Sequence, residues 1–291
     1  MPSHHEHHEF VDIDGESLYV ATYLPNEPPR AAAVFCLPIH EEQKSAYRPS
    51  VDAARAAADA GCACARFHYA GTDDSSGDVL LLTMERMAQD IVGVSELLRV
   101  RTGVERIALV GIRLGAAAAL MAAEGLAGLA GVLAVEPVQN GGTYLSRVMT
   151  RRKIRKMVTA AEGATEAEAA PAPTSSEPRD EVIDFDGHPI SAAQRASLEQ
   201  LSLAERTARL EAPVLILEVA ARDRTSKAAE DLAVSLTSRG ARVATRTLVA
   251  EPFWNSLGVI DLPELTEAVV SFVLDPAAAC ERGAGEGGAT P

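Results

Sequence analysis

The chain begins with two stretches whose apolar residues are spaced in different ways. In FVDIDGESLYVATYLP (residues 10–25), apolar and polar residues alternate around Asp14-Gly15, which predicts a β-hairpin with a tight turn. RAAAVFCLPIHEE (30–42) is instead a continuous apolar run that ends in a polar loop, a pattern typical of a strand buried on both faces. Residues 49–60 then predict a helix, with Pro49 near its start and a glycine after its end.

The order of strand, loop and helix repeats along most of the chain. We expect strands at 62–71, 106–111, 131–137, 212–223 and 241–249, and helices at 80–101, from 114 onward, at 227–239 and at 261–274. Repeated units of this length predict an α/β fold with a mostly parallel sheet covered by helices on both faces. Functional residues are then expected at the carboxyl ends of the strands.

The alternation is interrupted after residue 138. Residues 144–158 predict a basic helix, and residues 160–181 form an Ala, Glu, Pro and Ser tract with too few large apolar residues to pack, which predicts disorder. We therefore divide the chain into four parts. These are the N-terminal part of the core (1–140), a cap insertion (141–210) that contains the acidic tract, the C-terminal part of the core (211–276) and a flexible tail (277–291).

Composition favours a cytoplasmic globular protein. Hydrophobic residues make up 47% of the 291, enough for a sizeable core. The most apolar region, residues 114–135, is interrupted by Glu124 and several glycines, so it predicts helix, turn and strand instead of a membrane span. The N-terminus, MPSHHEHHEF, has no apolar core of the kind that a secretory signal needs.

The net charge and the spacing of histidines and cysteines argue against nucleic acid, metal ions and disulfide bonds. The formal net charge of −14 disfavours nucleic acid. A flexible histidine tract at a terminus has no fixed coordination geometry, so we predict no metal site there. The four cysteines form no CxxC pair and are predicted to be reduced, structural thiols. The sequence predicts no cofactor.

The stretch LVGIRLGAAAAL (109–120) carries the most informative motif. It predicts a buried strand that passes through a tight turn into a helix of small residues. Its centre, Gly111-Ile112-Arg113-Leu114-Gly115, has the spacing of the GxSxG nucleophile elbow, with arginine at the serine position. A guanidinium stays protonated and has no lone pair suited to attack, so the ordinary acyl-enzyme route is closed at this position.

The order of these elements resembles the α/β-hydrolase fold with a cap, over nearly the whole chain. More narrowly, the sequence is similar to the type 2 exosortase A system-associated hydrolases, a bacterial branch whose elbow also reads G-x-R-x-G. The similarity is carried by LPIHEEQKSAYR (37–48), FHYAGTDDSSGD (67–78), GIRLGA (111–116), EPVQNGGTYL (136–145), FDGHPIS (185–191) and EPFW (251–254). The resemblance implies a hydrolase by kinship, although His188 stands where the branch has tyrosine.

The hydrolase order also indicates which catalytic residues are missing. A carboxylate follows a late strand in this order, and Asp223 stands at that position. The catalytic histidine comes last, but no histidine follows His188. The loop after the last strand offers Glu251, Phe253, Trp254 and Asn255 instead. Two of the three triad members are therefore absent, which predicts a pseudoenzyme.

The elbow still predicts an anion pocket at a helix N-terminus. Backbone N–H groups of Leu114 and of the loop 38–41 are placed to bind a negative charge. We predict that the ligand-binding residues at this edge are Ile39, His40, Glu41, Glu42, Arg113, Leu114 and Trp254. Trp254, the only tryptophan, either lines the pocket where histidine would stand or fills it.

Arg113 needs an anionic partner because it lies beside the positive end of a helix dipole. Without one, this placement costs about 0.3 to 1 kcal/mol. One alternative is an internal ion pair with Glu41, Glu42 or Asp223. The other is a bidentate contact with a carboxylate or phosphate on a ligand.

Further alternatives concern groups around this site. Ser75, Ser76 or His40 could supply a relocated nucleophile or base, although turn formation also explains an Asp/Ser/Gly loop. The basic run in 144–158 could meet anionic lipid, an acidic partner or an anionic substrate, or be neutralised by the chain's own acidic tract. We therefore predict a protein that binds an anionic or acyl small molecule or acts as an accessory protein, as a homodimer or with a partner protein. The alternative is an active esterase or amidase.

Overall fold

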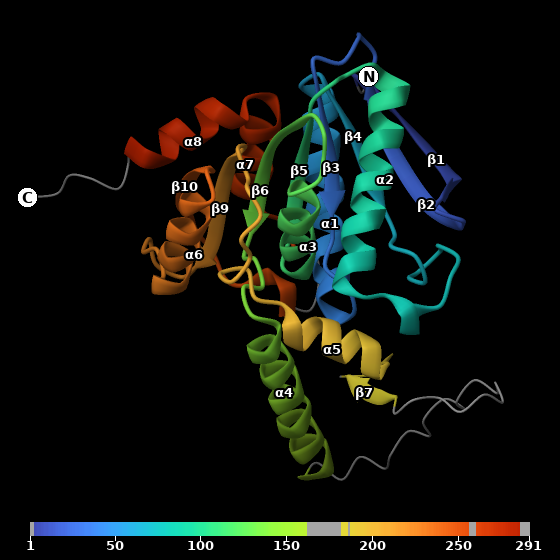
Figure 1. Ribbon diagram of the computed structural model, residues 1–291, viewed down its shortest axis with the longest axis vertical. Helices are drawn as coiled ribbons and strands as arrows, with labels where there is room; N and C mark the ends of the chain where they lie inside the picture. Colours follow the sequence, from blue (N-terminus) through green and yellow to red (C-terminus); the bar gives the residue numbers. More distant parts are fainter. Residues whose placement is uncertain (1–2, 162–181, 186, 256–259, 286–291) are drawn as a thin grey trace, which may run out of the picture.

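A central sheet of eight strands organises the chain, of which the computed structural model describes residues 3–161, 182–185, 187–255 and 260–285 (Figure 1). The strand order is β1-β2-β4-β3-β5-β6-β9-β10. The strands are β1 (His4–Ile13), β2 (Glu16–Pro25), β3 (Ala31–Cys36), β4 (Cys62–Phe67), β5 (Ile107–Ile112), β6 (Leu129–Val135), β9 (Pro213–Ala220) and β10 (Arg242–Val249). Strand β2 is antiparallel to β1 and β4, and the remaining pairs are parallel.

Helices cover both faces of this sheet, so the predicted α/β architecture is confirmed. One apolar core cluster joins the sheet to α2 (Met84–Thr102), α3 (Leu114–Ala123) and α6 (Lys227–Ser238). The cluster on the opposite face joins it to α1 (Glu41–Asp59), α7 (Pro263–Leu274) and α8 (Pro276–Gly285). The buried strands are apolar along their whole length because each of their faces packs against one of these two clusters.

The hairpin at the start of the sheet extends further toward the N-terminus than the sequence pattern indicated. Asp14 and Gly15 both have positive φ, 52° and 82°, as a two-residue turn of this kind requires. The predicted hairpin is confirmed, but β1 already begins at His4. The expectation that the histidine tract is flexible was therefore wrong, because its backbone pairs with β2 over ten residues.

The segment between β6 and β9 lies at the carboxyl ends of the parallel strands. It contains α4 (Gly141–Ala161), β7 (Ile183–Phe185), β8 (His188–Ile190) and α5 (Ala192–Gln200). Helix α4 extends away from the sheet, with α5 beside its start (Figure 1). Most of the tract predicted to be disordered, 160–181, lies outside the described residues, and the division of the chain into core and cap remains a prediction.

Two helix boundaries differ from the sequence prediction. Helix α1 begins at Glu41, eight residues earlier than expected, and Pro49 lies inside it. Its first turn contains Glu41 and Glu42, whose negative charges favour a helix N-terminus. The expected loose tail is helical as far as Gly285, because Ala279 and Cys280 are buried against the sheet. No helix among the described residues is long and apolar enough to cross a membrane.

Candidate functional site

The carboxyl ends of three adjacent strands carry residues with strained backbones. His40 precedes α1 with φ 62° and ψ −141°, Arg113 precedes α3 with φ 55° and ψ −119°, and Glu136 follows β6 with φ 47°. Such angles are uncommon for residues other than glycine and cost about 1 to 3 kcal/mol each. Strain of this kind clusters where a backbone holds a side chain in a functional position. The three residues therefore mark this edge of the sheet as the candidate site.

Hydrogen bonds on both sides of Arg113 hold the elbow in its strained shape. The Arg113 N–H donates to the carbonyl of Val135 at 2.9 Å. The Arg113 carbonyl accepts from the N–H groups of Ala116, Ala117 and Val138 at 3.1, 3.2 and 3.3 Å. The chain thus keeps the backbone geometry that presents a side chain at the top of β5, although that side chain is not a nucleophile.

The Arg113 guanidinium is held mainly by an internal carboxylate. Its Nε lies 3.3 Å from both carboxylate oxygens of Glu42, and its Nη2 donates to Oε1 of Glu42 at 3.2 Å. Its Nη1 donates to the carbonyl of Glu136 at 3.1 Å and lies 3.9 Å from that residue's Oε2. The side chain of Glu42 is 4% exposed and that of Arg113 is 15% exposed. Of the three internal partners that the sequence allowed, the structure selects Glu42.

Aromatic rings enclose this ion pair. The guanidinium carbon of Arg113 lies 4.8 Å from the ring centre of Trp254, which is buried, and 6.0 Å from that of Tyr144. Burial, together with the negative charge of Glu42, raises the pKa of the Tyr144 hydroxyl. Trp254 occupies a short 3₁₀ turn, Phe253–Asn255, after β10. The indole ring that follows the last strand of the sheet thus covers the Arg113 cation.

The other predicted site residues lie apart from this cluster. Ile39 and Leu114 are buried in the apolar core. Asp223 is exposed on the loop after β9, and within the described chain the ion pairs of Arg113 are with Glu42 and Glu136. Glu41 pairs with Lys44 at 2.9 Å.

Glu136 is a site residue that sequence reasoning missed. Its Oε1 accepts from the N–H of Val219, at the end of β9, at 2.7 Å. Burial raises the pKa of the Glu136 carboxyl, although the Val219 N–H and Arg113 act in the opposite direction. Its position directly after β6, at the start of the EPVQNGG stretch, was the available signal.

A pocket of about 660 Å³ opens beside Arg113. Its lining includes Arg113, Glu136, Tyr144, Arg147, Arg151, Glu218 and Trp254, from the strand ends, α4 and the loop after β10. No histidine or cysteine belongs to the described lining of this pocket. Ser226, which also lines it, donates to Glu218 at 2.5 Å and accepts from the N–H of Ala229 as the cap of α6.

The candidate nucleophiles outside the pocket hold local structure together. Ser75 Oγ donates to the carbonyl of His68 at 2.8 Å and accepts from the N–H of Tyr19. Ser76 Oγ donates to Glu16 at 2.6 Å. Both contacts anchor the loop after β4 to the hairpin. Cys36 is fully buried, which raises the pKa of its thiol and disfavours the reactive thiolate.

A second hollow of about 850 Å³ lies beside the first turns of α1, lined in part by His40, His68, Asp74 and His188. The ring centres of His40 and His188 are 4.9 Å apart, and Nε2 of His40 is buried without a hydrogen-bond partner. Burial, with a smaller contribution from the charge of His188, lowers the pKa of His40 from 6.5 to about 3. His40 is therefore neutral at pH 7.

Acidification should destabilise the fold through His40. Below pH 6.5 the unfolded chain takes up a proton at this residue, whereas the folded chain does not until about pH 3. The free energy of unfolding should therefore fall between these limits, by about 3 kcal/mol at pH 4 from this residue alone. Urea unfolding at pH 7 and pH 4 measures the effect. His40→Asn removes the titrating ring but tolerates positive φ, so it should show a smaller loss. Equal losses in the two proteins would contradict the prediction.

Comparisons with known proteins give a fold but no family. No profile of a known protein family matches the chain, and no curated protein matches it. Solved structures do match. Est1E from Butyrivibrio proteoclasticus with ferulic acid bound aligns with a TM-score of 0.60 at 16% identity, over 91% of this chain and 97% of that one.

Two further structures extend this likeness. The esterase PF2001 from Pyrococcus furiosus aligns with a TM-score of 0.61 at 11% identity, over 93% of this chain and 90% of that one. The α/β-hydrolase domain-containing protein 10 from mouse aligns with a TM-score of 0.50 at 14% identity, over 92% of this chain and 95% of that one. The chain has the α/β-hydrolase fold, as predicted, and identities this low establish the fold alone.

Proposed function

We propose that this α/β-hydrolase-fold protein binds a small molecule with a carboxylate or phosphate group and does not perform serine-type hydrolysis. The observation that carries the proposal is Arg113, a cation fixed at the nucleophile position on the wall of a pocket of about 660 Å³. This volume lies in the range of small-molecule sites. A hydrolase would need a nucleophile and a base in hydrogen-bond contact at that place.

The charges around the pocket favour an anion. Arg147 and Arg151 line it from α4. The acidic groups of the lining already accept backbone hydrogen bonds, Glu136 from Val219 and Glu218 from Ser226. Three arginines, Arg113, Arg147 and Arg151, therefore line the pocket, and among its described residues they outnumber the two carboxylates, Glu136 and Glu218.

Arg113 itself retains hydrogen-bonding capacity. A guanidinium has five N–H groups. Its described contacts use one on Nε, one on Nη1 and one on Nη2. One further N–H on each of Nη1 and Nη2 is left for an oxyanion, which matches the planar geometry of a carboxylate or phosphate. Trp254 and Tyr144 supply apolar surface for an acyl or aromatic portion of the ligand.

We further infer kinship with the exosortase A system-associated hydrolases, a cytoplasmic location and a cap role for residues 141–210. The kinship is supported by the arginine elbow and the quoted stretches, and the cap role by the α4 residues that line the pocket. The same site fits an accessory role to a partner protein. In that role the protein would bind the anion without converting it chemically, and the partner would respond to whether the anion is bound.

Ligand binding is tested through the single tryptophan. Trp254 covers Arg113, so titration with hexanoate or phenyl phosphate should change its fluorescence. Arg147→Glu together with Arg151→Glu should weaken binding by about a hundredfold, because two attractive charges become repulsive. Lys153→Glu is the matched control on the same helix, since Lys153 is exposed and outside the described lining. Equal affinities in all three proteins would contradict the proposal.

Hydrolysis of short-chain and long-chain p-nitrophenyl esters tests the second part of the proposal. We expect no turnover above background from the wild type, from Arg113→Ser or from Asp223→Ala, because the pocket contains no histidine base among its described lining residues. Wild-type turnover that Asp223→Ala abolishes would instead establish an active hydrolase with relocated catalytic residues.

A further inference from the structure

We propose that the free edge of β1 pairs with the same edge of a second copy of this chain, giving a dimer with antiparallel β1 strands across a twofold axis. The contact would join two eight-stranded sheets into one. It lies at the opposite end of the sheet from β9 and β10, so it is independent of the function proposed for the pocket.

Strand β1 is the terminal strand of the sheet (Figure 1). It is ten residues long and pairs with β2 without a break in register, from His4 opposite Pro25 to Ile13 opposite Glu16. Its sequence, HHEHHEFVDI, has no proline and no lysine. Natural proteins protect edge strands with proline, lysine, bulges or short length. Charged side chains also protect an edge, but here Glu6 and Glu9 are paired with Arg55 and Arg101 of the same chain. The outward backbone groups of β1 are therefore open to another strand.

The hairpin geometry identifies which backbone groups face outward. A two-residue turn is closed by a hydrogen-bonded pair, here Ile13 and Glu16, and hydrogen-bonded pairs then alternate along the ladder. The carbonyl of Ser3 accordingly accepts from the N–H of Asn26 at 2.9 Å. The odd-numbered residues of β1 therefore bond to β2. The even-numbered residues direct their N–H and C=O groups to the open edge, namely His4, Glu6, His8, Phe10 and Asp12.

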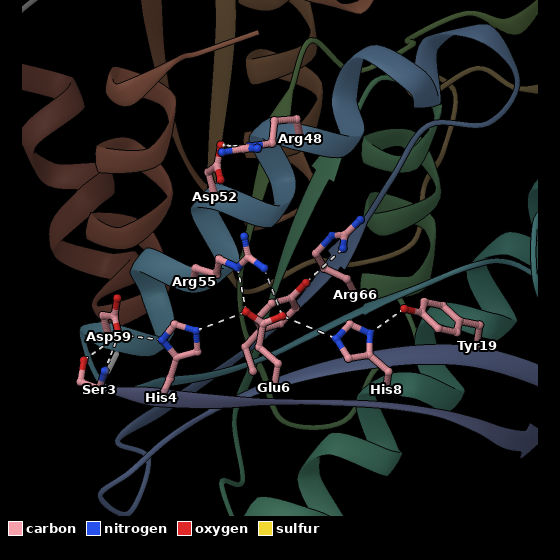
Figure 2. Close-up of polar contacts among 11 residues, drawn as sticks. Ser3, His4, Glu6, His8, Tyr19, Arg48, Asp52, Arg55, Asp59 and Arg66 are labelled. Atoms are coloured by element: carbon pink, nitrogen blue, oxygen red, sulfur yellow. Dashed lines mark hydrogen bonds and ion pairs between the residues drawn. The ribbon is translucent and has the colours of Figure 1, made fainter. Parts of the chain in front are cut away.

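Side-chain contacts hold this edge in place. Figure 2 shows His4, Glu6 and His8 pointing from β1 toward α1 and β2. Nδ1 of His4 lies 2.7 Å from Asp59, Glu6 accepts from Arg55 at 2.7 Å, and Nδ1 of His8 lies 2.6 Å from the Tyr19 hydroxyl. On the other face, Glu9 pairs with Arg101. A strand fixed from both faces loses little conformational entropy when a partner strand is added.

The side chains of β1 offer hydrogen-bond donors and acceptors that are complementary between two copies. In an antiparallel pair centred on His7, His5 lies opposite Glu9 and Glu6 lies opposite His8, and twofold symmetry repeats each pair. A histidine ring N–H donates a hydrogen bond to a carboxylate without carrying a charge, whereas like charges in directly facing positions destabilise a sheet. His7 faces its own copy in this register. A register centred on Glu6 would place that residue opposite its own copy. A register centred on His8 would pair His7 with Glu9 and His4 with Asp12, but it would place Glu6 opposite Phe10.

The outward backbone groups are consistent with the register centred on His7. Antiparallel pairing requires hydrogen-bonding residues to face one another. Glu6 opposite His8 satisfies this condition, because both are even-numbered. The same register places His4 opposite Phe10, whose side chain is 61% exposed in the single chain. A contact of this kind is closed, since each copy uses the same surface, and it produces dimers instead of fibres.

Sedimentation equilibrium over micromolar concentrations tests the proposal on the full chain. The wild type should approach twice the mass of the 30.6 kDa chain. His8→Pro removes an outward N–H from each copy and leaves the ladder to β2 intact, so it should weaken the dimer about tenfold or more. His8→Ala loses the same contacts with Tyr19 and with Glu6 of the other copy but keeps the N–H, so it should weaken the dimer less than His8→Pro does.

A second pair of variants tests the register. His5→Glu would face Glu9 of the other copy with a like charge and should weaken the dimer, whereas His5→Lys should preserve it. Circular dichroism spectra identical to the wild type would show that the variants fold. A wild type that stays monomeric, or a dimer unchanged by His8→Pro, would overturn the proposal. A monomer whose β1 strand pairs with a strand of a different protein would also overturn the proposal, because the partner of β1 would then not be a second copy of this chain.

Discussion

Gly115→Ala should prevent stable folding or lower the free energy of unfolding by about 4 kcal/mol or more. Gly115 lies in the first turn of α3, where the helix crosses the end of β3. A Cβ atom at this position would lie under 3.0 Å from the carbonyl oxygens of Cys36 and Leu37, a separation that real Cβ atoms essentially never show. Both oxygens belong to the backbone of the central sheet region, so neither can move without displacing other chain segments.

Thermal unfolding and the yield of folded protein measure this effect. Gly125→Ala is the matched control, because nothing lies within 4 Å of a Cβ at Gly125. That variant should unfold close to the wild type. If Gly115→Ala also unfolded near the wild-type temperature, the close approach of α3 to β3 would not be needed for stability.

Glu42→Leu should lower the free energy of unfolding by about 3 kcal/mol, because it leaves the Arg113 guanidinium without its main partner in a largely buried place. The side chain of Glu42 is 4% exposed and that of Arg113 is 15% exposed, so hydration can stabilise neither charge fully when its partner is removed. Glu136 carries a second carboxylate near Arg113, but its Oε2 is 3.9 Å from Nη1 and its Oε1 is bonded to Val219. It therefore replaces only part of the lost interaction.

A double-mutant cycle separates this ion pair from general packing. Arg113→Met alone should also destabilise, because Glu42 would be left buried without a cation. Glu42→Leu combined with Arg113→Met should cost less than the sum of the two changes, since two apolar side chains of similar size replace a buried ion pair with little loss. Urea unfolding of the four proteins measures the coupling. Additive effects would show that Arg113 and Glu42 do not stabilise each other.

The partner of Arg113 illustrates what a single sequence leaves open. The arginine at the elbow and the need for an anion beside it follow from local pattern and from the helix dipole. Glu41 and Glu42 are adjacent in sequence, however, and successive residues at a helix start point in different directions. Only the packing of α1 against the sheet turns Glu42 inward to Arg113 and leaves Glu41 beside Lys44.

Contacts distant in sequence explain the predictions that were wrong. The histidine tract has no apolar periodicity, and it becomes a strand because β2 pairs with it and because Asp59 and Arg55 of α1 bind its side chains. The C-terminal segment is rich in alanine and glycine, and it becomes helical where it covers β9 and β10. In both cases long-range contacts outweigh a weak local preference.

By itself, the sequence determined the α/β architecture, the hairpin, the strand-turn-helix elbow and the arginine at its centre. Each of these depends on residues close together in the chain, through apolar periodicity, turn-forming residues and the chemistry of one side chain. Tertiary structure alone decided that Arg113 pairs with Glu42, that Glu136 joins them and that Trp254 covers the cation. These contacts join residues up to 141 positions apart in sequence, between Arg113 and Trp254. Local pattern contains no distance information over such separations, which only the packed sheet and its helices supply.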